Sequence, residues 1–211
     1  MVDKLDKRHT DTEKIILEAA RQVFIRKGFD GARMQEIADE ANINKALLHY
    51  YFRSKDKLFM AIFVEVIQSF ILTSVKLIQN PGHSVFDKIR LFVEKYISLI
   101  QENPYLPGFI LNELNQRPDR LVGIFKRSGL ELDYFYSQIE KEVKEGKIEP
   151  VEPEHLLVNM ISMCIFPFVG KPLINTIILS GSEKDFNLFM EERKKTIPEF
   201  IINSIKKQKN K

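Results

Sequence analysis

Two short amphipathic helices joined by a tight turn are predicted for residues 34–58, MQEIADEANINKALLHYYFRSKDKL, and this segment constrains the fold more than any other. In the first helix, apolar side chains recur at spacings of three and four residues, at Met34, Ile37, Ala38 and Ala41. Asn42 follows where the chain must turn, and asparagine adopts the left-handed backbone conformation more readily than most residues. Asn44 can then cap a second helix, with Ile43 packing back beside it.

The second helix carries a buried face and an unusual opposite face. Leu48 and Phe52 lie one turn apart and are expected to face the core. The opposite face holds a small residue, a leucine and a tyrosine edged by cationic and imidazole groups: Ala46, Leu47 and Tyr50, with Lys45, His49 and Arg53. Such a surface suits a DNA major groove, where apolar groups contact thymine methyls and tyrosine or lysine contacts phosphates. The alternative is that both helices merely complete a bundle, which would leave Leu47 and Tyr50 without a purpose.

These motifs resemble the opening of the TetR/AcrR (tetracycline-repressor-like) family of regulators. The resemblance starts with TEKIILEAARQVFIRKGFDGARMQEIA at residues 12–38 and includes the IA-x-x-A-x-I pattern at 37–43. It continues through LHYYFRSKDKL at residues 48–58, so it covers about the first quarter of the chain. The remainder is similar to the family only in length and helical character.

Three positions depart from the family pattern. Asn42 replaces a frequent turn glycine, Leu47 stands where small or polar residues are common, and His49 stands where tyrosine is common. We expect these differences to change which operator is read rather than whether DNA is read.

Long stretches of helical spacing predict an all-α protein, and the resemblance implies that it has two parts. Residues 1–55 would form an amino-terminal three-helix bundle with a helix-turn-helix, and residues 56–211 a larger helical domain for effector binding and dimerisation. The positions implied to touch DNA are Arg33, Met34, Asn44, Lys45, Ala46, Leu47, His49, Tyr50, Tyr51 and Lys55. Lys45 and Lys55 are expected to pair with phosphates, and the hydroxyls of Tyr50 and Tyr51 to contact the DNA backbone.

Helical spacing and capping signals predict the remaining elements, and alternating strand patterns are scarce. A mobile arm at residues 1–9 would precede a helix capped by Thr10 and Glu13 and ended by Gly28. Asp56, Ser84 and Ser182 or Asp185 are further capping candidates. The expected later helices are 57–79, 84–102, 109–116, one long helix at 117–144, then 153–170, a continuation at 173–179, and a last helix ending near 206.

The family resemblance implies an effector site in the carboxy-terminal part, whose helices are rich in Phe and Met. The candidate lining residues are Phe63, Phe70, Phe92, Tyr96, Phe109, Met160, Met163 and Phe166, with Asn112, Glu113, Asn159 and Cys164 as orienting polar groups. Helix-bundle interiors commonly hold such pockets. The alternative for most of these side chains is an ordinary core.

Two apolar segments near the end, residues 155–170 and 185–205, are expected to pair with their twofold copies in a homodimer. Two reading helices per dimer match a palindromic operator. The alternative is that these helices pack within one subunit.

Composition excludes several classes of protein. The net charge of +3 is too small to identify a nucleic-acid-binding protein, so placement of the cations carries that argument. Cys164 is the single cysteine, which excludes an intramolecular disulfide. No secretory h-region follows the charged start and no membrane span is expected, so the expected location is cytoplasmic. No HExxH pattern or Gly-rich phosphate loop occurs, so we expect no enzyme, metal or cofactor.

The main interpretation is a DNA-binding repressor that an effector releases from a palindromic operator. Two other functions remain open from sequence. One is a helical enzyme or carrier for an apolar small molecule, and the other is a DNA-binding regulator without an effector. Specific, salt-sensitive binding to palindromic DNA would favour a regulator over an enzyme or carrier. Release of that DNA by a metabolite would favour a regulator with an effector over one without.

Overall fold

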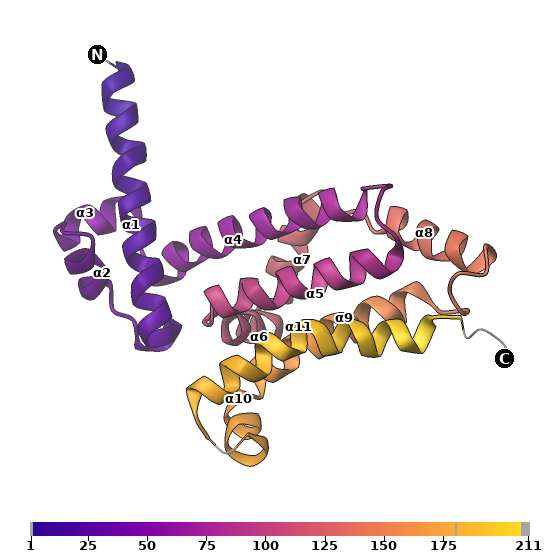
Figure 1. The fold of residues 1–211 in the computed structure, drawn as a ribbon. Helices are drawn as coiled ribbons and strands as arrows, with labels where there is room; N and C mark the ends of the chain where they lie inside the picture. The colour runs from indigo at the N-terminus through magenta and orange to yellow at the C-terminus, as the bar shows by residue number, and fades with distance from the viewer. Residues whose placement is uncertain (1, 180, 208–211) are drawn as a thin grey trace. The chain divides into compact units, whose positions relative to one another are not determined.

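The computed structural model describes the backbone of residues 2–179 and 181–207, with side chains from residue 11 onward. The regular elements of these residues are helices, and the chain is all-α as expected (Figure 1). They are α1 Val2–Gly31, α2 Met34–Glu40, α3 Lys45–Tyr51, α4 Lys55–Ile78, α5 Val85–Glu102, α6 Leu106–Gln116, α7 Pro118–Arg127, α8 Asp133–Lys144, α9 Pro153–Val169, α10 Lys171–Leu173, the π-helix η1 Ile174–Ile178 and α11 Glu183–Ile205.

The chain forms two compact units, of which the first contains Met1–Ser69 and Asn103–Asn112. In this unit α2 and α3 lie beside α1. Aromatic rings from three distant segments form its core, because Phe59 lies 4.8 Å from Phe24 and 4.2 Å from Phe109 between ring centroids. Such ring pairs stabilise a core beyond the area they bury.

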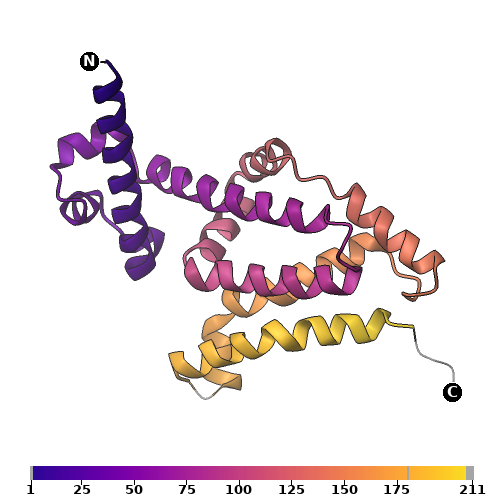
Figure 2. The same cartoon turned by 45° about the horizontal axis from the view of Figure 1, so that its top comes forward.

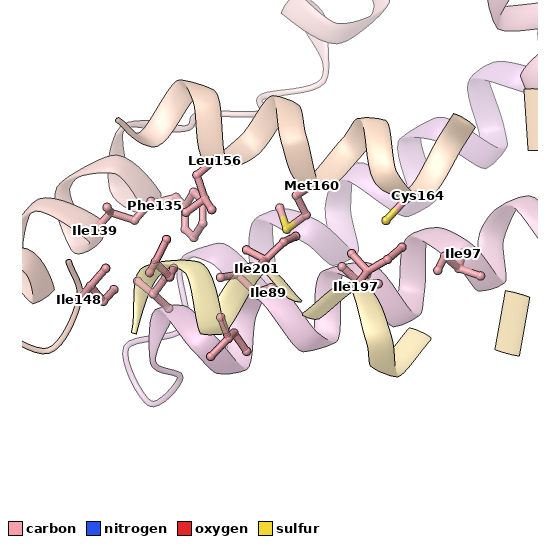
Figure 3. Packing of buried hydrophobic residues seen from close by; sticks show 14 of the residues in the cluster. Ile89, Ile97, Phe135, Ile139, Ile148, Leu156, Met160, Cys164, Ile197 and Ile201 are labelled. Carbon is pink, nitrogen blue, oxygen red and sulfur yellow. The ribbon is translucent and has the colours of Figure 1, made fainter. Parts of the chain in front are cut away.

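The second unit contains Phe70–Glu102 and Glu113–Lys211, and α5, α9 and α11 run alongside one another within it (Figure 2). Its core is a continuous cluster of buried aliphatic side chains with Phe135, Phe186 and two methionines. Figure 3 shows Ile89 and Ile97 from α5 together with Met160 and Cys164 from α9 and Ile197 and Ile201 from α11. The stripe at spacings of three and four along α5 explains why this helix contacts both others.

Several predicted helix ends are confirmed by capping contacts. Ser84 Oγ accepts from the Asp87 backbone N–H at 3.2 Å, and Ser182 Oγ accepts from the Asp185 N–H at 3.1 Å. Gly28 has φ +68° and breaks the regular helix of α1. At the start of α4 the cap is Ser54 rather than Asp56, because Ser54 Oγ accepts from the Lys57 N–H at 3.2 Å.

Two predictions about the helices were wrong. The segment expected to be a mobile arm is helical from Val2, since residues 2–9 contain no proline or glycine and nothing stops the helix from extending back past Thr10. The helix expected at 117–144 is interrupted, because Gly129 has φ +72° and ends α7 before α8 begins.

The division into compact units also differs from the expected boundary after residue 55. α4 belongs to the first unit as far as Ser69, because Phe59 and Phe63 pack against the rings of Phe24 and Phe109. The start of α6 joins the same unit through Phe109 and Tyr105.

α4 is long and apolar enough to cross a membrane by length and composition, and so is the pair of α9 with Lys171–Ile178, which bends by 67°. Half of the most apolar window of α4 is buried inside the protein. Core helices of globular proteins meet the same criterion when they are buried on more than one side.

Candidate nucleic-acid interface

The turn between α2 and α3 is fixed by backbone contacts. Asn42 has φ +53°, the left-handed conformation predicted for it. The Asn42 N–H donates to the Asp39 carbonyl at 3.1 Å, and the Ile43 N–H donates to the Ala38 carbonyl at 3.0 Å. These bonds satisfy the last carbonyl groups of α2 while the chain reverses direction.

α3 is anchored at its start and along one face. Asn44 Oδ1 accepts from the Leu47 N–H at 2.8 Å, which confirms the predicted cap. Leu48 is fully buried and Phe52 is 7% exposed, so the predicted core face is also confirmed. The rotation of α3 about its own axis is therefore fixed.

The opposite face of α3 points to solvent. Tyr50 is 70% exposed and Leu47 is 36% exposed, with Ala46, Lys45 and His49 exposed beside them. The ring of Tyr50 meets that of Tyr51 edge-on, with 5.5 Å between the centroids. An apolar and aromatic face edged by a cation on a rigid helix has the size and chemistry that major-groove readers use.

At the start of α2, the N-cap residue Arg33 is exposed and Met34 is half-buried. Glu36 accepts from the Arg33 backbone N–H at 3.3 Å and from Lys27 Nζ of α1 at 2.7 Å. The Lys27 hydrogen bond, with smaller contributions from the Arg33 N–H and both positive charges, lowers the Glu36 pKa against the opposing effect of desolvation. A second ion pair, Arg26 to Glu40 at 2.5 Å, also joins α1 to α2.

Lys55 has a role in the structure that sequence reasoning missed. Its ammonium donates to the carbonyls of Asp30 at 3.2 Å and Ala32 at 3.0 Å, and it lies 4.6 Å from the centre of the Phe29 ring. The group therefore ties the start of α4 to the segment that leads into α2. The partners are backbone groups more than 20 residues away, so no sequence pattern points to this contact.

The candidate effector residues fall in both compact units. In the first unit, Phe63 and Phe109 are in ring contact at 5.2 Å. Phe109 and the exposed Asn112 also line a cavity of about 270 Å³, together with Phe29 and Tyr105.

In the second unit, Phe70, Phe92 and Tyr96 form an aromatic group with centroid distances of 5.5 to 6.0 Å. Burial raises the Tyr96 pKa, and it also raises the pKa of the Cys164 thiol to about 12. Both groups are therefore neutral at ordinary pH.

The other candidates of the second unit take different positions. Met160 and Cys164 are part of the buried cluster, and Met163 is packed against it. Glu113 is buried and accepts from Arg120 Nη1 at 3.4 Å, so its carboxylate already has a partner. Phe166 is 62% exposed and thus differs from an interior lining residue.

Comparison with known proteins agrees with this geometry. The model for bacterial regulatory proteins of the tetR family matches residues 16–62. The HTH-type transcriptional regulator RutR of Escherichia coli K12 is 31% identical over 148 residues, which cover 69% of this chain and 68% of RutR. The HTH-type transcriptional regulator YhgD of Bacillus subtilis 168 is 27% identical over 164 residues, covering 74% of this chain and 81% of YhgD.

The fold is also shared with solved structures. The transcriptional regulator FadR from Bacillus subtilis, in complex with stearoyl-CoA, aligns with a TM-score of 0.64 at 16% identity, over 90% of this chain and 97% of FadR. The relatives named here are regulators rather than enzymes. The chain therefore belongs to the tetR family of bacterial regulatory proteins, and it is a DNA-binding transcriptional regulator.

Proposed function

We propose that this regulator is a homodimeric repressor that binds a palindromic operator and is released by a small apolar or amphipathic effector. The outward face of α3, formed by Ala46, Leu47 and Tyr50, is the single observation that carries the proposal. A monomer presents only one helix of seven residues, which is little surface for specific recognition. Two copies related by a twofold axis would read two half-sites.

The apolar surfaces of α9 and α11 support the dimer. Val158 and Phe166 on α9 are 60% and 62% exposed, and Leu188 and Phe200 on α11 are 60% and 66% exposed. Exposed apolar side chains on two long neighbouring helices are typical of a subunit interface. Pairing of the two helices with their copies would cover them in a four-helix contact.

The effector part of the proposal is supported by the aromatic composition of the second unit and by FadR, whose structure contains stearoyl-CoA. An effector need only bind more tightly to the form that does not fit the operator. A preference of about 1–3 kcal/mol would weaken DNA binding about 5- to 150-fold. A bacterial regulator of this kind acts where the chromosome lies, in the cytoplasm.

Selection of bound DNA from a random pool tests the function. The expected result is an inverted repeat whose half-sites lie about one helical turn, or a multiple of it, apart. Fluorescence anisotropy with that fragment would then be repeated with stearoyl-CoA and with fractions of a cell extract, and release of the DNA is expected. A selected pool that shows no enrichment of any sequence would contradict the proposal.

Two alternatives are outcomes of the same experiment. Failure to enrich any DNA, with tight binding of an apolar compound, would favour a carrier or enzyme. Enrichment of a palindrome that no extract fraction releases would favour a regulator without an effector.

A further inference from the structure

A cavity of about 420 Å³, lined mainly by residues with polar or charged groups, lies in the second compact unit where α8 meets the turn between α4 and α5. This volume is in the range that binds small metabolites. None of the candidate effector residues lines it. Its chemistry also differs from the apolar site proposed above, so it requires a separate explanation.

A hydrogen-bonded network fixes the floor of this cavity. Lys88 is 2% exposed, and its ammonium donates to the Ile78 carbonyl and to Gln138 Oε1. Gln138 Nε2 in turn donates to Glu142 Oε1 at 2.8 Å and to the carbonyl of His83 at 2.9 Å. Both the oxygen and the nitrogen of the Gln138 amide are therefore already hydrogen-bonded, and the floor is ordered before any ligand binds.

Glu142 belongs to the same floor and also has partners. Besides Gln138, its Oε1 accepts from the Val85 N–H at 3.2 Å, and its side chain is 8% exposed. Burial lowers the pKa of Lys88, and the negative charge of Glu142 opposes this lowering because it favours the charged ammonium. The buried carboxylate is thus compensated by a buried ammonium.

Four other groups in the wall have donors to offer. Within residues 2–179 and 181–207, the hydroxyls of Tyr134 and Ser137 and the imidazole of His83 make no side-chain hydrogen bond. Lys141 makes only a long ion pair to Glu145 at 3.9 Å. Hydroxyl, imidazole and ammonium groups can all donate to an acceptor placed among them.

The charge balance of the cavity is positive. Glu145 is held by Lys147 at 2.6 Å, which neutralises it, and Glu142 is matched by Lys88. Lys141 then remains as excess positive charge at the wall, next to Ser137 one turn earlier on α8. An acceptor-rich, negatively charged group matches these donors best.

We propose that this cavity binds a small oxyanion, the carboxylate or phosphate group of a metabolite, through Lys141, Ser137 and His83. The rest of the metabolite would lie against the Tyr134 ring. The site is additional to the apolar effector site. It does not depend on the proposed repressor activity, since its residues lie outside the DNA-binding helices α2 and α3.

The test uses the full-length chain labelled with ¹⁵N and titrated with inorganic phosphate, succinate or sodium chloride at matched ionic strength. Saturable amide shifts are expected at residues 82–84 and 134–142 with phosphate or succinate but not with chloride. The better of the two probes identifies phosphate or carboxylate as the preferred group. A dissociation constant in the millimolar range or tighter is expected for such fragments.

Two substitutions on α8 give a matched comparison. Lys141→Gln is expected to weaken binding about tenfold or more, because it removes a charge-assisted hydrogen bond. Lys144→Gln, also on α8 but outside the cavity lining, is expected to leave binding unchanged. Circular dichroism would confirm that both variants are folded. Shifts that chloride reproduces, no saturable binding of either probe, or equal weakening by both substitutions would overturn the proposal.

Discussion

Arg193 of α11 donates from Nη2 to the backbone carbonyl of Met163 in α9 at 2.8 Å. In a regular helix this carbonyl would accept from the N–H four residues later, but that residue is Pro167, which has no N–H. α11 therefore supplies the donor that α9 lacks. The contact joins two helices of the second unit at the point where one contains a proline.

Replacing Arg193 tests this relationship. Arg193→Met keeps much of the apolar stem but leaves the Met163 carbonyl without its donor, and the free energy of unfolding is expected to fall by about 1–3 kcal/mol. Urea unfolding followed by circular dichroism would measure it. In a Pro167→Ala background, alanine restores a backbone donor, so the same substitution should cost less. An equal cost in both backgrounds would contradict the account.

Lys55 and Lys45 are expected to affect DNA binding in different ways. Since the Lys55 ammonium bonds to the carbonyls of Asp30 and Ala32, Lys55→Met should lower thermal stability and DNA affinity without changing the salt dependence. Lys45 is exposed on α3, so Lys45→Ala should lower the salt slope by about one.

Anisotropy titrations at several salt concentrations would separate these effects. Lys57→Met, an exposed neighbour of Lys55 on α4, is the control and should change neither stability nor slope. A reduced slope for Lys55→Met with unchanged stability would instead support the phosphate contact predicted from sequence.

Phe166 is expected to contribute to the dimer interface rather than to an effector pocket. Phe166→Glu would place a charge in an apolar contact, where it could not be solvated, and should shift the protein from dimer to monomer. Sedimentation velocity at several concentrations would measure the change. Leu72→Glu is a suitable control because Leu72 is 60% exposed on α4 and lies outside the proposed interface. A dimer that survives Phe166→Glu unchanged would place the interface elsewhere.

The lowered pKa of Glu36 predicts that the free energy of unfolding depends on pH in acid. Its folded-state pKa lies below the ordinary value of 4.5, so the ionised carboxylate stabilises the fold above pH 4.5 and this stabilisation is lost as pH falls through the lowered pKa. Glu36→Gln should therefore flatten the decline of the unfolding free energy in acid below pH 4.5. Urea unfolding at a series of pH values would measure this. A decline as steep as in the unchanged protein would show that the Lys27 contact contributes nothing.

The helix-turn-helix of α2 and α3 could be predicted from sequence because the contacts that determine it are local. The turn at Asn42, the cap at Asn44 and the backbone hydrogen bonds of Leu48 and Phe52 join residues no more than five positions apart, so spacing and capping rules apply directly. Gly129 also carried a usable signal, since it follows two basic residues at the end of α7, yet the apolar periodicity on either side favoured one continuous helix.

The positions of the candidate effector residues were less predictable because their contacts are long-range. Aromatic and methionine residues at helical spacing are equally typical of a core, and only the fold shows Met160 buried and Phe166 exposed. The same holds for Arg193, whose partner is a carbonyl 30 residues earlier.

The most direct measurement is the affinity of Leu47→Ala and Tyr50→Ala for the selected operator and for scrambled DNA. Both side chains point to solvent, so the thermal stability of each variant should stay close to that of the unchanged protein. Specific binding should weaken by about 1–3 kcal/mol per substitution, while binding to scrambled DNA changes far less for Leu47→Ala. Full operator affinity in both variants would contradict the assignment of this face of α3 to DNA recognition.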